Sequence, residues 1–281
     1  MALLEVKQLT KHFGGLTAVG DVTLELNEGE LVGLIGPNGA GKTTLFNLLT
    51  GVYEPSEGTV TLDGHLLNGK APYKIASLGL GRTFQNIRLF KDLTVLDNVL
   101  IAFGNHHKQH VFASFLRLPA FYKSEKELKA KALELLKIFD LDGDAETLAK
   151  NLAYGQQRRL EIVRALATEP KILFLDEPAA GMNPTETEEL MKTIKLIRDK
   201  FGIAILLIEH DMKLVLGICE RLIVLDHGTI IASGDPQKVV NDPAVVTAYL
   251  GKDDDEIDEE EAKNKEIASV KAEIFNDEEE V

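Results

Sequence analysis

The sequence predicts an α/β fold built around a buried parallel sheet. Its main support is three continuous apolar runs of strand length, at residues 31–35, 172–175 and 203–208. A helical pattern at residues 45–49 follows the first run, and another at about 186–200 separates the other two. A glycine-rich loop stands between the first run and its helix. Strand, glycine-rich loop and helix in this order predict a phosphate-binding framework.

Weaker strand patterns flank this core. Residues 4–9 and 21–26 alternate between apolar and polar side chains, as half-buried strands do. Residues 59–62 show the same alternation and end at the turn pair Asp63 and Gly64. The chain then changes character, since residues 96–166 are mostly helical in pattern. The sequence therefore predicts a nucleotide-binding core that is interrupted by a helical insertion.

The loop itself carries the chemistry of a triphosphate site. Its glycines allow backbone N–H groups to turn toward an anion, and the following helix N-terminus adds partial positive charge. Lys42 would reach the outer phosphates, and Thr43 would offer its hydroxyl to Mg²⁺. A simple glycine turn is the alternative, but the flanking strand and helix favour the phosphate site. The candidate ATP-binding residues are Gly36, Pro37, Asn38, Gly39, Ala40, Gly41, Lys42, Thr43 and Thr44.

Polar residues follow the two later apolar runs. Asp176 and Glu177 end the run at 172–175, and His210 follows the run at 203–208. The carboxyl ends of parallel strands meet at the edge where ligands of such sheets bind. Asp176 is placed to hold Mg²⁺, Glu177 to orient and polarise the attacking water, and His210 to reach the terminal phosphate. The alternative is that these are solvated strand ends.

Composition restricts the other classes of function. The 281 residues fit one large α/β domain or two smaller ones, and the longest apolar stretch, residues 203–208, is far below the roughly 20 that span a bilayer. The N-terminus lacks a signal-peptide pattern, and the single cysteine, Cys219, excludes an internal disulfide and is expected in the core. Residues 251–281 contribute −10 of the net charge of −14, so the remainder gives no compositional case for nucleic acid binding.

A further set of motifs resembles the ATP-binding-cassette (ABC) ATPases. Residues 152–156 and the helix after them look like the signature motif of this family, shortly before the strand that ends at Asp176. A glutamine loop at Gln85, a crossover loop at residues 179–183 and a switch at His210 complete the set in the expected order. The resemblance covers about residues 3–250. It adds Phe13 as the aromatic ring that stacks on adenine, and its signature residues are Leu152, Ala153, Tyr154, Gly155 and Gln156.

The resemblance implies an architecture and an assembly. It implies a P-loop NTPase (RecA-like) core over residues 1–95 and 166–250, with an N-terminal antiparallel β subdomain and a helical subdomain at about 96–165. ATP and Mg²⁺ would be bound, with Thr43, Gln85 and Asp176 as metal ligands and Glu177, His210 and Gln85 as catalytic residues. The signature would act in trans, within a homodimer or heterodimer of ABC ATPase subunits. Membrane permease subunits would anchor the pair at the cytoplasmic face of the membrane, and an extracytoplasmic solute-binding protein would take part indirectly.

Several segments narrow the resemblance to branched-chain amino acid importers, and to the longer of their two ATPase subunits. These segments are residues 82–90, 151–156, 179–184, 208–212 and 248–251. Two departures from the broad family are shared with this subgroup. Ala153 replaces a serine that donates to the γ-phosphate, so backbone N–H groups near Gly155 must serve instead, and Asn183 replaces an aspartate.

The sequence leaves some alternatives open for the function, the cargo and the C-terminal extension. A cassette ATPase of DNA repair or translation is disfavoured, because this chain has neither a long coiled-coil insertion nor a second cassette. Urea, amides or a lipid remain possible cargoes. The acidic extension 251–281 is expected to be a loose appendage, with a docked regulatory helix as the alternative. His106, His107 and His110 are expected in a polar loop rather than a metal site, and Arg158 and Arg159 on a solvated helix face.

Overall fold

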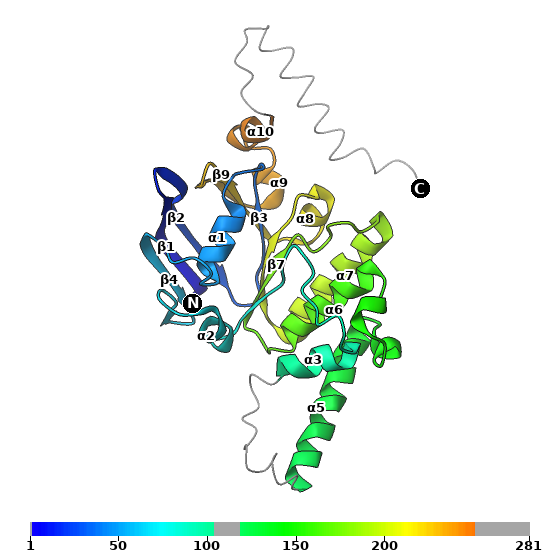
Figure 1. Ribbon diagram of the computed structural model, residues 1–281. Helices are drawn as coiled ribbons and strands as arrows, with labels where there is room; N and C mark the ends of the chain where they lie inside the picture. Colours follow the sequence, from blue (N-terminus) through cyan, green and yellow to red (C-terminus); the bar gives the residue numbers. More distant parts are fainter. Residues whose placement is uncertain (1, 104–118, 251–281) are drawn as a thin grey trace.

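A six-stranded sheet forms the centre of the molecule, in a computed structural model that describes residues 2–103 and 119–250 (Figure 1). Its strand order is β10-β9-β3-β8-β7-β6, and all neighbours are parallel except β9 and β10. The predicted buried strands are confirmed as β3, β8 and β7. The strands of this sheet are β3 (Leu31–Ile35), β6 (Leu80–Arg82), β7 (Ile172–Asp176), β8 (Ala204–Ile208), β9 (Arg221–Asp226) and β10 (Thr229–Gly234).

A second, antiparallel sheet covers one face of the first. Its order is β2-β1-β4-β5, and it contains the three weaker strand patterns predicted from the sequence. Helix α1 (Lys42–Leu49) lies between the two sheets, and its apolar side chains share one core cluster with theirs. The strands are β1 (Ala2–Phe13), β2 (Leu16–Asn27), β4 (Glu57–Leu62) and β5 (His65–Leu66).

Helices cover the opposite face of the parallel sheet. Helices α6, α7 and α8 pack there in a second core cluster, which continues into α3 and α5 (Figure 1). This second cluster includes Cys219, which is buried as expected. Besides α1, the helices are α2 (Pro72–Ser77), α3 (Val95–Phe103), α5 (Pro119–Ile138), α6 (Tyr154–Leu166), α7 (Pro184–Phe201), α8 (Met212–Ile218), α9 (Pro236–Val239) and α10 (Pro243–Leu250).

The alternation of side chains explains why the central strands are apolar throughout. On β3, Leu31 and Ile35 belong to the cluster under the helices, whereas Val32 and Leu34 belong to the cluster under the antiparallel sheet. Because successive side chains of a strand point to opposite faces, the interior of a strand in a sheet that is covered on both faces favours apolar residues at every position. All five residues of β3 are therefore buried.

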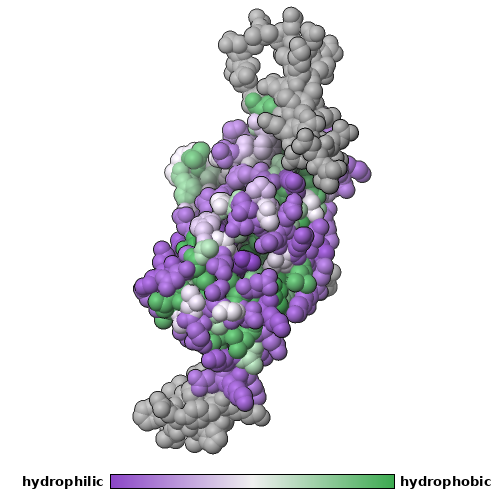
Figure 2. Space-filling view, turned by 90° about the vertical axis from the view of Figure 1, so that its right-hand side faces the viewer, coloured by the Kyte–Doolittle hydropathy of each residue, from purple (hydrophilic) through white to green (hydrophobic). Residues whose placement is uncertain are grey.

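Helix α7 shows how a covering helix is delimited. Leu190, Ile194 and Ile197 are its buried residues, at the spacing of one helix face. Asn183 caps its N-terminus, and Gly202 ends it with a left-handed φ of +62°. The face of the molecule on which α7 lies is mostly hydrophilic, with small apolar patches (Figure 2). Among the described residues, no helix combines the length and apolar character that a membrane span requires.

Candidate functional site

The phosphate loop connects β3 to α1 and requires glycine at two positions. Gly36 has a φ of +150°, and a Cβ atom there would lie 2.0 Å from the carbonyl oxygen of Leu225. Gly41 has a φ of +100°, and a Cβ atom there would lie 2.6 Å from the carbonyl oxygen of Ala18. Close packing against β9 and the β1–β2 hairpin therefore fixes the loop in a conformation that only glycine permits.

The interior of this loop is a cluster of hydrogen-bond donors. Lys42 is only 7% exposed, and its ammonium donates to the carbonyl oxygens of Gly36 at 2.6 Å and Pro37 at 2.8 Å. Burial lowers the pKa of Lys42, and the nearby charge of Glu177 opposes this shift. Within the described residues, six backbone N–H groups of the loop and helix start find no acceptor, namely those of Asn38, Gly39, Gly41, Lys42, Thr43 and Thr44. Buried or aligned N–H groups without a protein acceptor, next to an ammonium, fit a polyphosphate.

Asp176 lies at the carboxyl end of β7 and is held by a cation. One Nη atom of Arg82 is 3.3 Å from Asp176 Oδ2, and both side chains are nearly buried. Burial raises the pKa of Asp176, while the Arg82 guanidinium opposes that rise. The Asp176 N–H donates to Thr83 Oγ1 at 3.3 Å, which ties the end of β7 to the residue after β6. Asp176 is thus positioned by its neighbours, with Oδ1 left for another ligand.

Glu177 is the centre of a three-residue arrangement. Gln85 donates its amide to Glu177 Oε2 at 2.7 Å, and His210 Nε2 lies 2.9 Å from Glu177 Oε1. The Glu177 backbone has a φ of +47°, an uncommon left-handed conformation for a non-glycine residue, and its N–H donates to Ile208. Residues that are 33 and 92 positions away from Glu177 in the chain therefore converge on its carboxylate.

A magnesium ion would meet oxygen ligands here. Thr43 is exposed at the first turn of α1, and Gln85 keeps Oε1 available because only its amide nitrogen contacts Glu177. Asp176 supplies a carboxylate oxygen. Hydroxyl, amide and carboxylate oxygens are the donors that Mg²⁺ prefers, so these three residues fit the ion chemically. No cluster of three His, Cys, Asp or Glu side chains suited to a metal occurs in the part of the chain that the structure describes.

The signature residues form the start of α6. Ala153 occupies the N-cap position, where its methyl group cannot accept a hydrogen bond, and Gln156 reaches back to accept from the Ala153 N–H at 3.1 Å. Gly155 is buried, and a Cβ atom there would lie 2.9 Å from Glu186 Oε1. The Tyr154 ring packs against Gly181 of the crossover loop. Signature and crossover loop thus form one surface.

Phe13 lies at the end of β1, on the hairpin that reaches the phosphate loop through Ala18. Its ring is half-exposed and meets Tyr53 edge-on, with ring centroids 5.4 Å apart. The Lys11 ammonium lies 5.2 Å from the centre of the Phe13 ring. An exposed aromatic ring on a hairpin that contacts the phosphate loop through Ala18 is suited to stacking on a base.

The expectation for Arg158 is wrong. The structure buries this side chain completely, whereas Arg159 beside it is half-exposed. Residues 84–88 fold over Arg158 and accept its hydrogen bonds, a tertiary contact that local sequence patterns do not reveal. Sequence reasoning also missed Arg82 as the partner of Asp176. The expectations for His106, His107, His110 and for residues 251–281 fall outside the described residues.

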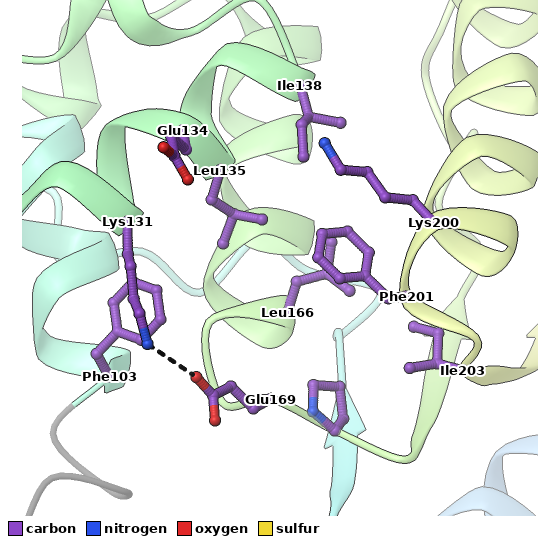
Figure 3. A pocket seen from close by; sticks show the side chains of 11 residues that line it. Phe103, Lys131, Glu134, Leu135, Ile138, Leu166, Glu169, Lys200, Phe201 and Ile203 are labelled. Atoms are coloured by element: carbon purple, nitrogen blue, oxygen red, sulfur yellow. Dashed lines mark ion pairs between the residues drawn. The ribbon is translucent and has the colours of Figure 1, made fainter. Parts of the chain in front are cut away.

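Cavities also occur elsewhere on the described surface. One has a volume of about 390 Å³ at the junction of α3, α5, α6 and α7, with Leu135, Leu166 and Phe201 on its apolar wall (Figure 3). An ion pair between Lys131 and Glu169 stands at its rim. No residue of the phosphate loop or of the Glu177 arrangement lines it, so it is separate from the candidate site. Another cavity, of about 480 Å³, borders residues 80–88 and includes Arg82, the partner of Asp176, in its lining.

Comparison with known proteins agrees with this geometry. Residues 19–180, more than half of the chain, match the ABC transporter family. Residues 229–255 match a C-terminal family described as branched-chain amino acid ATP-binding cassette transporter.

Individual proteins give the same result. The branched-chain amino acid transport ATP-binding protein LivG of Salmonella typhimurium is 50% identical over 250 residues, which cover 89% of this chain and 98% of LivG. BraF of Pseudomonas aeruginosa, with the same description, is 48% identical with the same coverage. Among solved structures, a nucleotide-free ATP-binding cassette from an ABC transporter has a TM-score of 0.77 at 34% identity, covering 90% of this chain and all of that one. A phosphate loop with open donors, a carboxylate pair at the sheet edge and a relative of this closeness lead to one conclusion: the chain belongs to the ABC transporter family, as a nucleotide-binding ATPase subunit.

Proposed function

We propose that this chain hydrolyses ATP to energise the import of branched-chain or related amino acids through a membrane permease. The observation that carries the hydrolytic part is the arrangement at Glu177, whose two carboxylate oxygens are bound by Gln85 and His210. The likeness to LivG and BraF supports the cargo. Since selectivity would reside in the permease and in a solute-binding protein, urea, amides or a lipid are the competing cargoes.

Hydrolysis would proceed by in-line attack of water on the γ-phosphorus of ATP. Glu177 would accept a proton from this water as its oxygen attacks, and the bond between the γ-phosphorus and the bridging oxygen would break to release ADP. In the described arrangement both oxygens of Glu177 are occupied, so a shift of the Gln85 amide would free Oε2 for the water. Lys42 would bind the outer phosphate oxygens, and His210 would contact the terminal phosphate.

Mg²⁺ would be held by Thr43, Gln85 and Asp176. When bound, it would neutralise charge that develops on the phosphate oxygens. Arg82 would keep Asp176 ionised and oriented toward this position, because it pairs with only one carboxylate oxygen.

A complete site would need two protomers. The signature residues lie at the N-terminus of α6, where the N–H groups of Tyr154, Gly155 and Gln156 have no acceptor among the described residues. Such a helix start favours an anion. We infer that it covers ATP held on the phosphate loop of a second cassette, in a homodimer or a heterodimer. Solved cassettes with TM-scores of 0.71 at 28% identity are dimeric, one of them with bound ADP and phosphate.

The permease would dock in the cavity of about 480 Å³ beside residues 80–88. Tyr73 and Ile101 contribute exposed apolar side chains to its lining, and Arg88 and Arg164 contribute cations. Exposed apolar surface with a polar rim is typical of an interaction site. A permease segment in this groove would contact the stretch that carries Gln85 and would place the chain at the cytoplasmic face of the membrane.

Reconstitution tests this function. The chain would be combined in liposomes with the permease, solute-binding protein and second ATPase subunit that its own genome supplies. We expect ATP-dependent uptake of labelled leucine, which Ile101→Glu abolishes by blocking docking while ATP binding stays intact. Uptake of urea or amides without uptake of leucine would contradict the proposed cargo. The absence of ATP hydrolysis in the full assembly would contradict the proposed activity.

A further inference from the structure

A buried ion pair on α6 has no role in the site described so far. Arg158 Nη1 lies 3.0 Å from Glu161 Oε2, and the two side chains are 0% and 5% exposed. Arg158 is the largest fully buried side chain of the described residues. Burial raises the pKa of Glu161, because desolvation penalises its charged form, and the Arg158 guanidinium opposes this rise.

The remaining hydrogen bonds of this pair go to the backbone of residues 84–88. Arg158 donates to the carbonyl oxygen of Phe84 at 2.7 Å and to that of Gln85 at 2.6 Å. Glu161 Oε1 accepts from the N–H of Phe84 at 3.4 Å and from that of Arg88 at 3.1 Å. Two charged side chains of one helix therefore hold four backbone groups of a segment that belongs to neither a helix nor a strand.

Both ends of this connection lead to the candidate site. Toward the signature, Arg158 Nη2 lies 3.4 Å from the hydroxyl of Tyr154, whose ring packs on Gly181 of the crossover loop. Toward the sheet edge, the side chain of Gln85 donates to Glu177. A continuous series of contacts thus runs from the signature through the buried pair to the proposed catalytic base.

Stability alone does not account for such a pair. Removing two charges from water carries a large desolvation penalty, and apolar residues of similar volume often stabilise a protein as well or better. What apolar residues cannot do is bind four backbone groups in a fixed register. The specific contribution of the Arg158–Glu161 pair is therefore that it attaches residues 84–88 rigidly to the signature helix.

We propose that Arg158 and Glu161 are positioning residues that make the signature helix and Gln85 move as one body. When the signature of one protomer engages ATP on the phosphate loop of its partner, Gln85 of the first protomer shifts with the helix. Because the Gln85 amide donates a hydrogen bond to Glu177, this shift changes how the proposed catalytic base is held in the first protomer's own ATP site. The pair thereby couples the two ATP sites of the dimer, an inference that rests on the signature acting in trans under the proposed function.

The test compares variants of neighbouring residues in the full-length chain. The double variant Arg158→Met/Glu161→Met keeps the core filled but removes all four backbone contacts, and Glu161→Gln removes the charge alone. Arg159→Met is the matched control, because Arg159 is the next residue on the same helix, is half-exposed, and makes no side-chain hydrogen bond or ion pair within the described residues. For each, the rate of ATP hydrolysis is measured against ATP concentration, together with ATP affinity and melting temperature.

We expect cooperative hydrolysis in the wild type and in the Arg159→Met control, with a Hill coefficient above 1. In the double variant, kcat should fall by about 2- to 30-fold and the Hill coefficient should approach 1, while ATP affinity stays at the wild-type value. Glu161→Gln should lower kcat and the Hill coefficient in the same direction but to a smaller extent. If the double variant does not fold, Glu161→Gln provides the test.

A Hill coefficient that stays at the wild-type value in a folded double variant would overturn the coupling role, even if the melting temperature of that variant is lower. Hydrolysis without cooperativity in the wild type would overturn it as well. Failure of the proposed function is distinguishable, because the wild type would then not hydrolyse ATP or would not dimerise with it.

Discussion

Replacing Glu177 by glutamine removes the charge of the proposed base with little change in shape. Glutamine can direct its carbonyl oxygen toward the Gln85 amide and its NH₂ group toward Nε2 of a neutral His210. Both contacts of the wild-type carboxylate therefore have a counterpart in the variant. ATP affinity should be unchanged, because neither Lys42 nor the N–H groups of the loop lose a partner.

The magnitude follows from the role of a general base. Positioned proton transfer contributes about 10²–10⁴-fold to a rate, so kcat of Glu177→Gln should fall by that factor. The corresponding rise in the activation barrier is about 3–5 kcal/mol. Since the exchange keeps both hydrogen bonds, the loss is assigned to the missing proton acceptor rather than to a displaced loop.

Phosphate release under saturating ATP measures the rate, and a fluorescent ATP analogue measures the affinity. Glu188→Gln, the same exchange on an exposed position of α7, is the matched control and should behave as the wild type does. A Glu177→Gln variant that hydrolyses ATP within about threefold of the wild-type rate would refute the assignment. So would a variant that loses ATP affinity along with hydrolysis, because the effect would then lie in binding.

Further predictions concern the cradle, the core and the acidic extension. Lys42→Ala should lose ATP affinity, since the one buried ammonium of the loop disappears, and unchanged binding in a nucleotide titration would remove Lys42 from the cradle. Cys219 should resist alkylation at pH 8 in the folded protein, because burial raises the pKa of its thiol to about 12. It should react after unfolding. Rapid labelling of the native protein, detected by mass spectrometry, would contradict its core position. Truncation before Lys252 should leave the ATPase rate unchanged if the acidic extension is a passive, solvated appendage, whereas a changed rate would favour a docked regulatory segment.

The central strands could be predicted from the sequence because both of their faces are buried. Strands β3 and β8 each read as five consecutive residues without a polar side chain, and β7 as four apolar residues followed by Asp176; the polar residues at the ends of β7 and β8 mark the edge of the sheet. Strand β6 has only three residues, one of them Gly81, and pairs with β7 alone, so it gives no periodic signal. Edge strand β10 is mostly half-exposed and shows no clean alternation.

The contacts of the candidate site that could not be predicted from the sequence also depend on residues far apart in the chain. The residue types of the phosphate loop, the strand-end carboxylates and His210 could be found because each follows a recognisable element. The partners Arg82 and Asp176 are 94 positions apart, and Arg158 meets a backbone segment more than 70 positions away. Only the folded chain brings such pairs together, which is why an arginine on a polar-looking helix turned out to be buried.

The most direct test of a shared site is a structure of Glu177→Gln in complex with ATP and Mg²⁺. It should contain two protomers facing each other, with the N–H of Gly155 of one protomer within hydrogen-bond distance of the ATP bound by the Lys42 loop of the other. A nucleotide enclosed by a single chain, with Gly155 remote from any phosphate, would contradict the account.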